Sequence, residues 1–163
     1  MIDWRKITEE RKEWVDKNFP PDNLNHTKLG MIEETGELVH HYLKMQQGIR
    51  GSELEHLEGM KDSVGDLVIY MLGCMWHWNY YPNTNYKYMT LSYSSHEDIL
   101  FRLDRAVAQV CHDGVAKAID VVLFYLDKFC ELQQWELEPI VLDTWDKVKQ
   151  RDWTKNKQDG SVG

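Results

Sequence analysis

The stretch Gly30-Met-Ile-Glu-Glu-Thr-Gly-Glu-Leu-Val-His-His-Tyr-Leu-Lys44 combines three nearby carboxylates with the apolar period of a helix. Glu33, Glu34 and Glu37 share one sector of a helical wheel with Lys44. Because clustered carboxylates beside apolar surface are costly without a compensating cation, we expect a divalent-metal site in a groove along this helix. The two apolar stripes on either side of that sector consist of Leu29, Ile32, Val39 and Leu43, and of Met31, Leu38, Tyr42 and Met45.

The composition is that of an ordinary globular protein, with 42% hydrophobic and 28% charged residues in a chain of 163. A net charge of −8 argues against a nucleic-acid binder, which needs a basic face to neutralise phosphates. The sequence has neither a signal peptide nor a membrane-spanning apolar run, and its 3 cysteines lack CxxC spacing. We therefore expect a cytoplasmic protein without a membrane partner, with one domain over 1–154 and a flexible tail over 155–163.

The periodicity predicts helices throughout and gives no convincing alternating strand pattern, so the expected fold class is all-α, an antiparallel helical bundle. Capping residues support several boundaries: Gly48 as a C-terminal cap, Ser52 with Glu55 as a capping box, and Ser95 as an N-terminal cap. The Tyr- and Asn-rich segment 79–95 is expected to be a loop with room for one short extended piece. The expected helices span about 2–18, then from an N-cap among residues 22–25 to about 47, and about 53–78, 96–112, 115–133 and 138–153.

A second helix must supply the other side of a metal site, and the range 53–78 carries four acids on one face. Among these, Asp62 and Asp66 lie nearest the apolar half of the helix. Asp66 is the stronger candidate because Asp is a poor mid-helix residue. A near-repeat within 115–133 leaves Asp120 as a rival to Asp66. The four acids are Glu55, Glu58, Asp62 and Asp66.

These segments resemble the MazG-like nucleoside triphosphate pyrophosphohydrolases. Glu33-Glu34-Thr-Gly-Glu37-Leu is similar to the EExxE motif of that family, and Val64–Leu72 is similar to its second acidic helix. The resemblance extends to Trp14 and Phe19, and to the basic segment Trp145–Trp153. The family pattern has a glutamate where this chain has Ser63, so we expect Asp62, one residue earlier, to replace it.

The resemblance implies a helical bundle of the MazG-like type, with an inserted loop and helix at about 79–114. It also implies hydrolysis of a nucleoside triphosphate to the monophosphate and pyrophosphate, and a deoxynucleoside triphosphate is the expected substrate. The cofactor would be Mg²⁺, with Mn²⁺ as a substitute, and the protein would be a homodimer or homotetramer. The implied metal ligands are Glu34, Glu37, Asp62 and Asp66, with Glu33 as a ligand or a water-orienting group, and the implied phosphate contacts are Lys44, Lys147 and Arg151.

Two other classes of function stay open. Glu37-Leu-Val-His40 has the ExxH form used by carboxylate-bridged di-iron bundles, an architecture that needs two such pairs on different helices. A non-catalytic nucleotide-binding or regulatory protein is permitted by Ser63 and by the insertion. Pyrophosphate release from a nucleotide would separate these classes from the hydrolase.

Overall fold

The computed structural model describes residues 1–162, which form helices and turns without any β-strand. The expected all-α fold class is therefore confirmed for this part of the chain. The elements are α1 (Trp4–Asn18), α2 (Leu24–Gln47), α3 (Glu53–Trp78), the short 3₁₀ helix η1 (Thr84–Tyr88), α4 (His96–Cys111), α5 (Ala118–Leu132) and α6 (Leu137–Val148).

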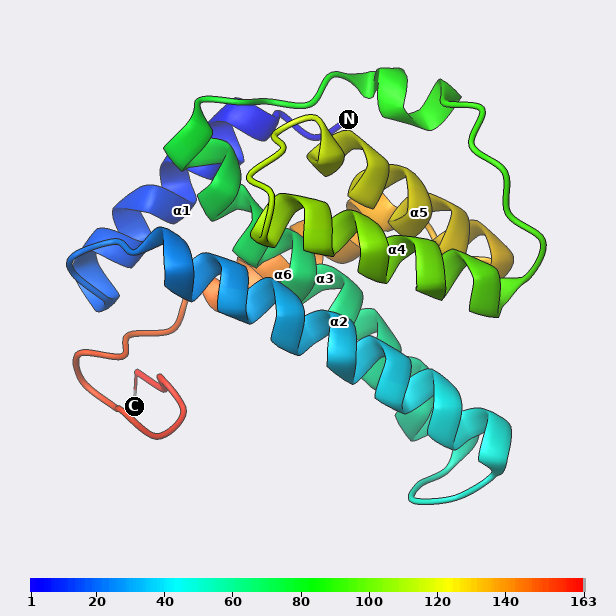
Figure 1. Ribbon diagram of the computed structural model, residues 1–163. Helices are drawn as coiled ribbons and strands as arrows, with labels where there is room; N and C mark the ends of the chain where they lie inside the picture. Colours follow the sequence, from blue (N-terminus) through cyan, green and yellow to red (C-terminus); the bar gives the residue numbers. More distant parts are fainter. Residues whose placement is uncertain (163) are drawn as a thin grey trace.

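The central element is α3, which pairs with α2 in a long antiparallel hairpin (Figure 1). It also contacts α1 and α6, while α4 contacts α2 and forms a second hairpin with α5. Between Ser63 and Met75 every side chain of α3 is buried except those of Asp66 and Tyr70, which are half-buried. These two residues are one helical turn apart, so they lie on the same face of α3, and this face is the only partly exposed one between Ser63 and Met75.

The predicted caps are confirmed. Gly48 ends α2 with a φ of 64°, and the side chains of Ser52 and Glu55 form the reciprocal bonds of a capping box at the start of α3. The hydroxyl of Ser95 accepts the N–H of Asp98 at the start of α4. Local side-chain chemistry therefore sets the ends of the three helices that carry most of the core.

The prediction for the last helix is wrong beyond Val148, where α6 ends. The backbone after Val148 forms hydrogen bonds with side chains of α1 instead of continuing the helix. The indole N–H of Trp14 donates to the carbonyl of Arg151 at 3.0 Å. The N–H of Trp153 donates to Asn18 Oδ1 at 2.7 Å. Lys147 and Arg151 consequently do not share one helical face, as a continuous helix would require.

Two smaller boundaries also differ from the prediction. Val115 to Lys117 form a turn, closed by a bond from the Ala118 N–H to the Val115 carbonyl, so α5 starts at Ala118. The loop after α3 runs across one end of the molecule and contains η1, and no extended pairing occurs within it (Figure 1). None of the helices within residues 1–162 is long and apolar enough to span a membrane.

Candidate functional site

The five predicted carboxylates come together where α2 and α3 face each other. Glu34 lies at the centre, with only 8% of its surface exposed. Burial, followed by the negative charges of the other four acids, raises its pKa to about 8. Those four are, in decreasing order of effect, Asp66, Glu37, Glu33 and Asp62.

Basic residues of the C-terminal segment face the same cluster. Burial raises the pKa of the half-buried Asp66, and the guanidinium of Arg151 is the largest opposing influence. Lys147 acts in the same direction more weakly. The structure therefore brings both predicted C-terminal cations near the acids, although they come from α6 and from the turn after it.

Asp62 and Ser63 have opposite surroundings. Ser63 is buried, and its hydroxyl donates to the carbonyl of Gly59 at 2.9 Å within the same helix. Asp62 is exposed and close enough for its charge to act on both Glu34 and Asp66. The register of α3 thus turns Asp62, and not Ser63, toward the acid cluster.

Two other predicted or rival residues have partners elsewhere. The ammonium of Lys44 donates to Gln47 Oε1 at 3.0 Å, about 10 Å along the helix axis from Glu37. Asp120 lies on α5 and accepts the hydroxyl of Tyr80. Its charge is not among those that shift the pKa of Glu34 or Asp66.

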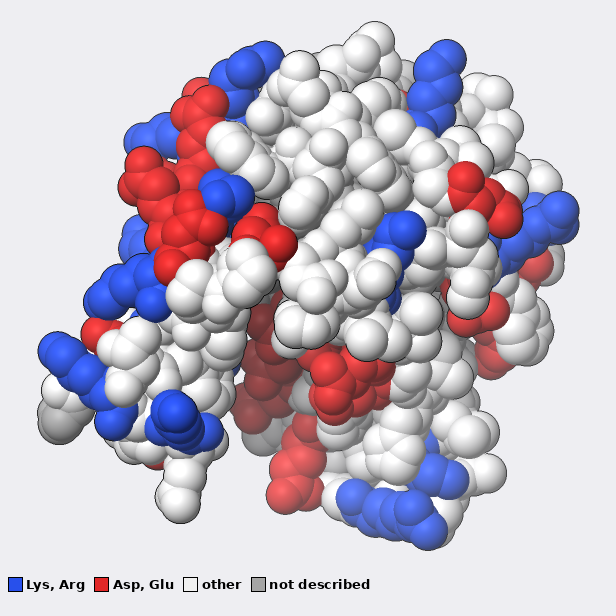
Figure 2. Space-filling model, turned by 60° about the vertical axis from the view of Figure 1, so that its left-hand side comes forward, with Lys and Arg blue, Asp and Glu red and all other residues white. Residues whose placement is uncertain are grey.

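A cavity of about 480 Å³ adjoins the carboxylates. Figure 2 shows a hollow on one face of the molecule with Asp and Glu side chains on its walls. Three acids of the cluster, Glu33, Glu34 and Asp66, line the cavity together with Arg151. Four aromatic rings also line the cavity, among polar and aliphatic residues, and they belong to Trp14, Phe19, Tyr70 and Trp153.

The aromatic wall is a packed unit rather than a set of separate rings. Phe19 lies 5.6 Å from Trp14 and 6.1 Å from Trp153, measured between ring centroids. On the opposite side, the ring of Tyr70 lies over Gly30, where a Cβ atom would fall 2.3 Å from the ring. Burial raises the pKa of the Tyr70 hydroxyl, and Glu34 adds to that shift. The cavity therefore has a planar apolar end and an acidic end.

The cavity also borders a buried charge that the sequence did not reveal. Arg11 donates from Nε to the carbonyl of Ile69 at 2.7 Å, while its Nη1 has no hydrogen-bond partner. Burial lowers the pKa of Arg11, and the negative charge of Asp22 partly offsets this. Asp22 Oδ2 lies 3.3 Å from His77 Nε2 without hydrogen-bond alignment. The signal that could have located it is its helical spacing with Ile7 and Val15, which puts Arg11 on the buried face of α1.

The donor set fits a hard divalent cation. Mg²⁺ prefers carboxylate oxygens, and in this cluster burial and the charges of four neighbouring acids still raise the pKa of Glu34, although Arg151 and Lys147 lie near Asp66. Within residues 1–162 no three His, Cys, Asp or Glu side chains already stand in a ligating arrangement. The carboxylate side chains would therefore have to change rotamer to coordinate a cation together. The exposed His40, the second half of the ExxH pair, packs edge-on against His41.

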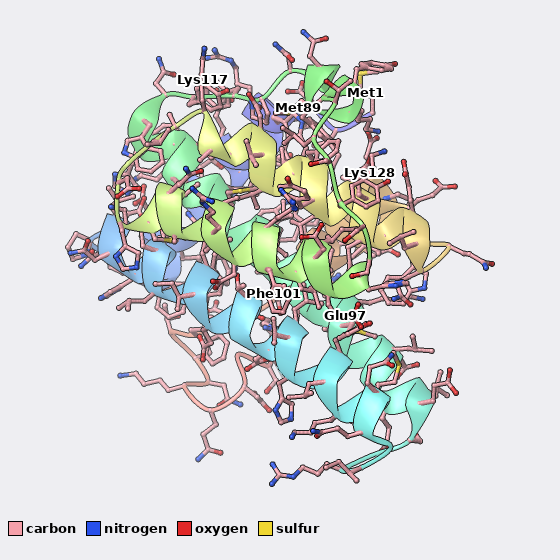
Figure 3. All side chains as sticks on the ribbon, turned by 45° about the vertical axis from the view of Figure 1, so that its right-hand side comes forward. Met1, Met89, Glu97, Phe101, Lys117 and Lys128 are labelled. Carbon is pink, nitrogen blue, oxygen red and sulfur yellow. The ribbon has the colours of Figure 1, made fainter. Side chains whose placement is uncertain are left out.

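Only one of the two predicted apolar stripes of α2 is buried by this chain. Met31 and Leu38 are fully buried, but the other stripe, Leu29, Ile32, Val39 and Leu43, is exposed. Contacts between α2 and α4 join Lys28 with Cys111 and Tyr42 with Glu97, and this register puts Phe101 level with Val39. Phe101 is 74% exposed on the outer side of α4 (Figure 3).

Comparison with known protein families, with curated proteins and with solved structures finds no match to this chain. The assignment of a function therefore depends on the chemistry of the site described above.

Proposed function

We propose that the protein hydrolyses a nucleoside triphosphate to the monophosphate and pyrophosphate, with Mg²⁺ as cofactor. The proposed substrate is a deoxynucleoside triphosphate, and the proposed location is the cytoplasm. The observation that carries this proposal is the continuity of one cavity from an aromatic wall to a carboxylate cluster. A nucleotide has the same two parts, a planar base and a polyanion. The MazG-like type of the bundle is part of the proposal and rests on the sequence motifs.

The acidic end requires a cation for this chemistry, because a triphosphate and five carboxylates repel each other. In the proposed site Glu34, Glu37, Asp62 and Asp66 hold Mg²⁺. When bound, the ion neutralises phosphate oxygens and lowers the pKa of a coordinated water. Glu33 is exposed beside them and serves as a further ligand or as the group that orients water.

The chain's own groups account for orientation. Arg151 and Lys147 approach the acids from the C-terminal segment and would contact the phosphates. Lys44, the third proposed phosphate contact, would have to leave Gln47 to do so. The rings of Trp14, Phe19 and Trp153 provide surfaces for stacking a base, which contributes about 1–3 kcal/mol per base in single-strand binding sites.

The exposed stripe of α2 supports a homo-oligomeric state, a dimer or tetramer. Its four apolar residues on α2 and Phe101 on the neighbouring α4 are all exposed. Apolar surface of this kind on a protein with otherwise polar helix faces is typical of a protein–protein contact.

A second function is favoured by one observation. The pKa of Glu34 is about 8, so this carboxyl group is protonated at neutral pH. Within residues 1–162, no three potential ligand side chains are arranged to bind a metal ion. A nucleotide-binding protein without hydrolytic activity would tolerate this arrangement. This candidate predicts binding of nucleotides without release of pyrophosphate.

The deciding experiment is a panel of the eight common ribo- and deoxynucleoside triphosphates, assayed for pyrophosphate with Mg²⁺ and with Mn²⁺. We expect at least one to be hydrolysed, and we expect Glu37→Gln and Asp66→Asn each to abolish turnover while circular dichroism remains helical. Glu9→Gln, an exposed substitution on α1, is the matched control. Failure of all eight nucleotides at high protein concentration would overturn the hydrolase proposal.

A further inference from the structure

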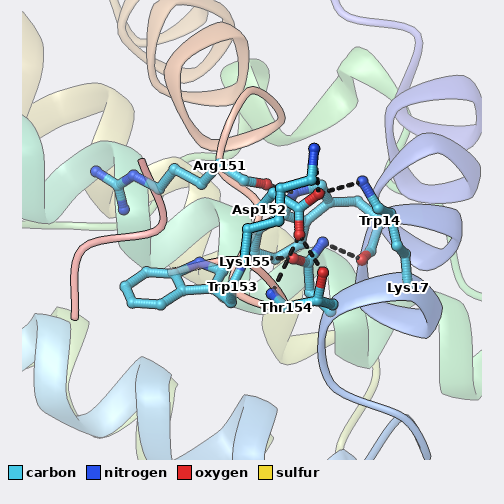
Figure 4. Close-up of polar contacts among 8 residues, drawn as sticks. Trp14, Lys17, Arg151, Asp152, Trp153, Thr154 and Lys155 are labelled. Carbon is cyan, nitrogen blue, oxygen red and sulfur yellow. Dashed lines mark hydrogen bonds and ion pairs between the residues drawn. The ribbon is translucent and has the colours of Figure 1, made fainter. Parts of the chain in front are cut away.

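The segment after α6 is organised around Asp152, which is only 4% exposed (Figure 4). Its carboxylate accepts bonds from the ammonium of Lys17 at 2.8 Å and from the N–H of Thr154 at 3.1 Å. Its own N–H donates to the carbonyl of Gly160 at 2.8 Å, which closes the following turns. One buried carboxylate therefore joins α1 to the whole segment from 149 to 160.

The residues on either side of Asp152 are fixed to the same end of α1. The Arg151 carbonyl accepts the indole N–H of Trp14, and the Trp153 N–H donates to Asn18 Oδ1. The side-chain amide of Asn18 in turn donates to the Trp14 carbonyl at 2.8 Å. Three consecutive residues are thus bonded to the last turns of α1, which leaves the segment little freedom to shift.

The side chains of Arg151 and Trp153 extend away from this network and toward the cavity. Figure 4 shows both projecting on the side opposite Lys17. Both line the cavity, and Arg151 is the cation with the largest effect on Asp66. Neither Lys17 nor Asp152 lines the cavity. The Lys17–Asp152 pair therefore stabilises the backbone between Arg151 and Trp153 without itself lining the cavity.

We propose that Asp152, through its bond to Lys17, is a positioning residue that holds Arg151 against the phosphates and Trp153 against the base of a bound nucleotide. This inference rests on the proposed nucleotide site and adds a specific role for residues outside it. A bound nucleotide touches Arg151 and Trp153, while the Lys17–Asp152 pair determines where those two side chains stand.

An alternative is that the pair only anchors the C-terminal segment to the fold. The two roles differ in their effect on ligand affinity. If Asp152 only contributes to stability, its loss lowers the melting temperature and leaves the dissociation constant of nucleotides unchanged. If it positions the site, affinity falls even in a variant that remains fully folded.

The test measures binding by calorimetry, using α,β-non-hydrolysable analogues of the eight nucleotides with Mg²⁺, so that it does not depend on turnover. For the analogue that binds best, Asp152→Ala and Lys17→Met are each expected to weaken binding by about tenfold or more. Lys17→Arg, which keeps the ion pair, should bind within about twofold of the wild type. Lys12→Met is the control, because it removes a different ion pair of α1, with Asp16.

Lys17→Met keeps the test decisive if Asp152→Ala does not fold, since the Lys17 side chain is 62% exposed. Unchanged affinity in folded Lys17→Met and Asp152→Ala would overturn the positioning role and leave the proposed function standing. Equal losses in Lys17→Arg and Lys17→Met would also contradict it. If no analogue binds to the wild type, both the nucleotide site and the positioning role are wrong. Binding without hydrolysis by the wild type contradicts only the catalytic proposal.

Discussion

The ring of Tyr70 on α3 lies directly over Gly30 on α2, at a distance that leaves no room for a Cβ atom at position 30. This contact occurs beside Glu34 and Asp66, where the two helices carry the carboxylates. The same close approach that packs the hairpin therefore also forms part of the wall of the cavity, next to its carboxylates.

Gly30→Ala is expected to destabilise the protein by about 1–3 kcal/mol, because the new methyl group would overlap ring atoms near the Tyr70 backbone. The free energy of unfolding in urea measures the effect. Gly36→Ala on the same helix is the control, since a Cβ there meets nothing within 4 Å and should stabilise the helix by up to about 1 kcal/mol. Similar effects of the two substitutions would contradict the close contact.

The stability of the metal-free protein should depend on pH through Glu34. Its pKa rises from 4.5 to about 8 on folding, so the folded state binds more protons than the unfolded state between these values. The free energy of unfolding therefore falls as pH rises across this window. Glu34→Gln should remove about 2 kcal/mol of that fall, with allowance for partial solvation. Parallel pH profiles for the wild type and Glu34→Gln would refute this assignment, and Glu9→Gln serves as the control.

Addition of Mg²⁺ should raise the melting temperature more at pH 8 than at pH 6. Metal binding requires the ionised carboxylate, and at pH 6 the ion must displace the proton of Glu34. The measurement is a thermal shift at a series of Mg²⁺ concentrations, with Glu34→Gln as the variant that should lose the pH dependence. An equal shift at both pH values would show that Glu34 takes no part in binding the ion.

Asp62→Asn should lower kcat/KM by at least about tenfold, whereas Ser63→Ala should change it by less than about twofold. The reason is orientation: Asp62 faces the acid cluster and Ser63 donates to the carbonyl of Gly59 inside the bundle. Steady-state kinetics on the preferred nucleotide provide the comparison. The reverse order of effects would mean that α3 is rotated relative to the arrangement described here.

The exposed stripe on α2 should hold subunits together. The double variant Val39→Lys with Phe101→Glu places charges at the centre of the apolar surface and is expected to lower the mass measured by light scattering to that of a monomer. Leu142→Glu, an exposed apolar position on α6, should leave the mass unchanged. A wild-type protein that is monomeric at high concentration would exclude this role for the stripe.

The sequence predicted the parts of the structure that depend on local chemistry. Helix periodicity located α3 and the end of α2 to within a residue, and the Ser52 and Gly48 caps were recognisable from residue type alone. The acid cluster followed from the same periodicity, because residues a turn apart on one face must lie together. Asp62 could be preferred to Ser63 on the same ground.

Contacts between distant segments could not be predicted in this way. The early end of α6 depends on Trp14 and Asn18, more than a hundred residues away, which bind its outgoing backbone. The aromatic wall depends on the same meeting of α1 with the C-terminal segment. Burial of Arg11 depends on the absence of a side chain at Gly73, because a Cβ atom at position 73 would lie 3.0 Å from the guanidinium of Arg11.

The bonds that complete the cavity join residues very far apart in sequence: Trp145 donates to Glu10, and Lys17 to Asp152, both across 135 positions. Closing such long loops is entropically costly, so these contacts form after the local α2–α3 hairpin during folding. During synthesis on the ribosome, α1 to α5 emerge before the aromatic wall can close. The cavity therefore acquires its aromatic wall only when the chain has been made as far as Trp153, and the proposed nucleotide site cannot be complete before then.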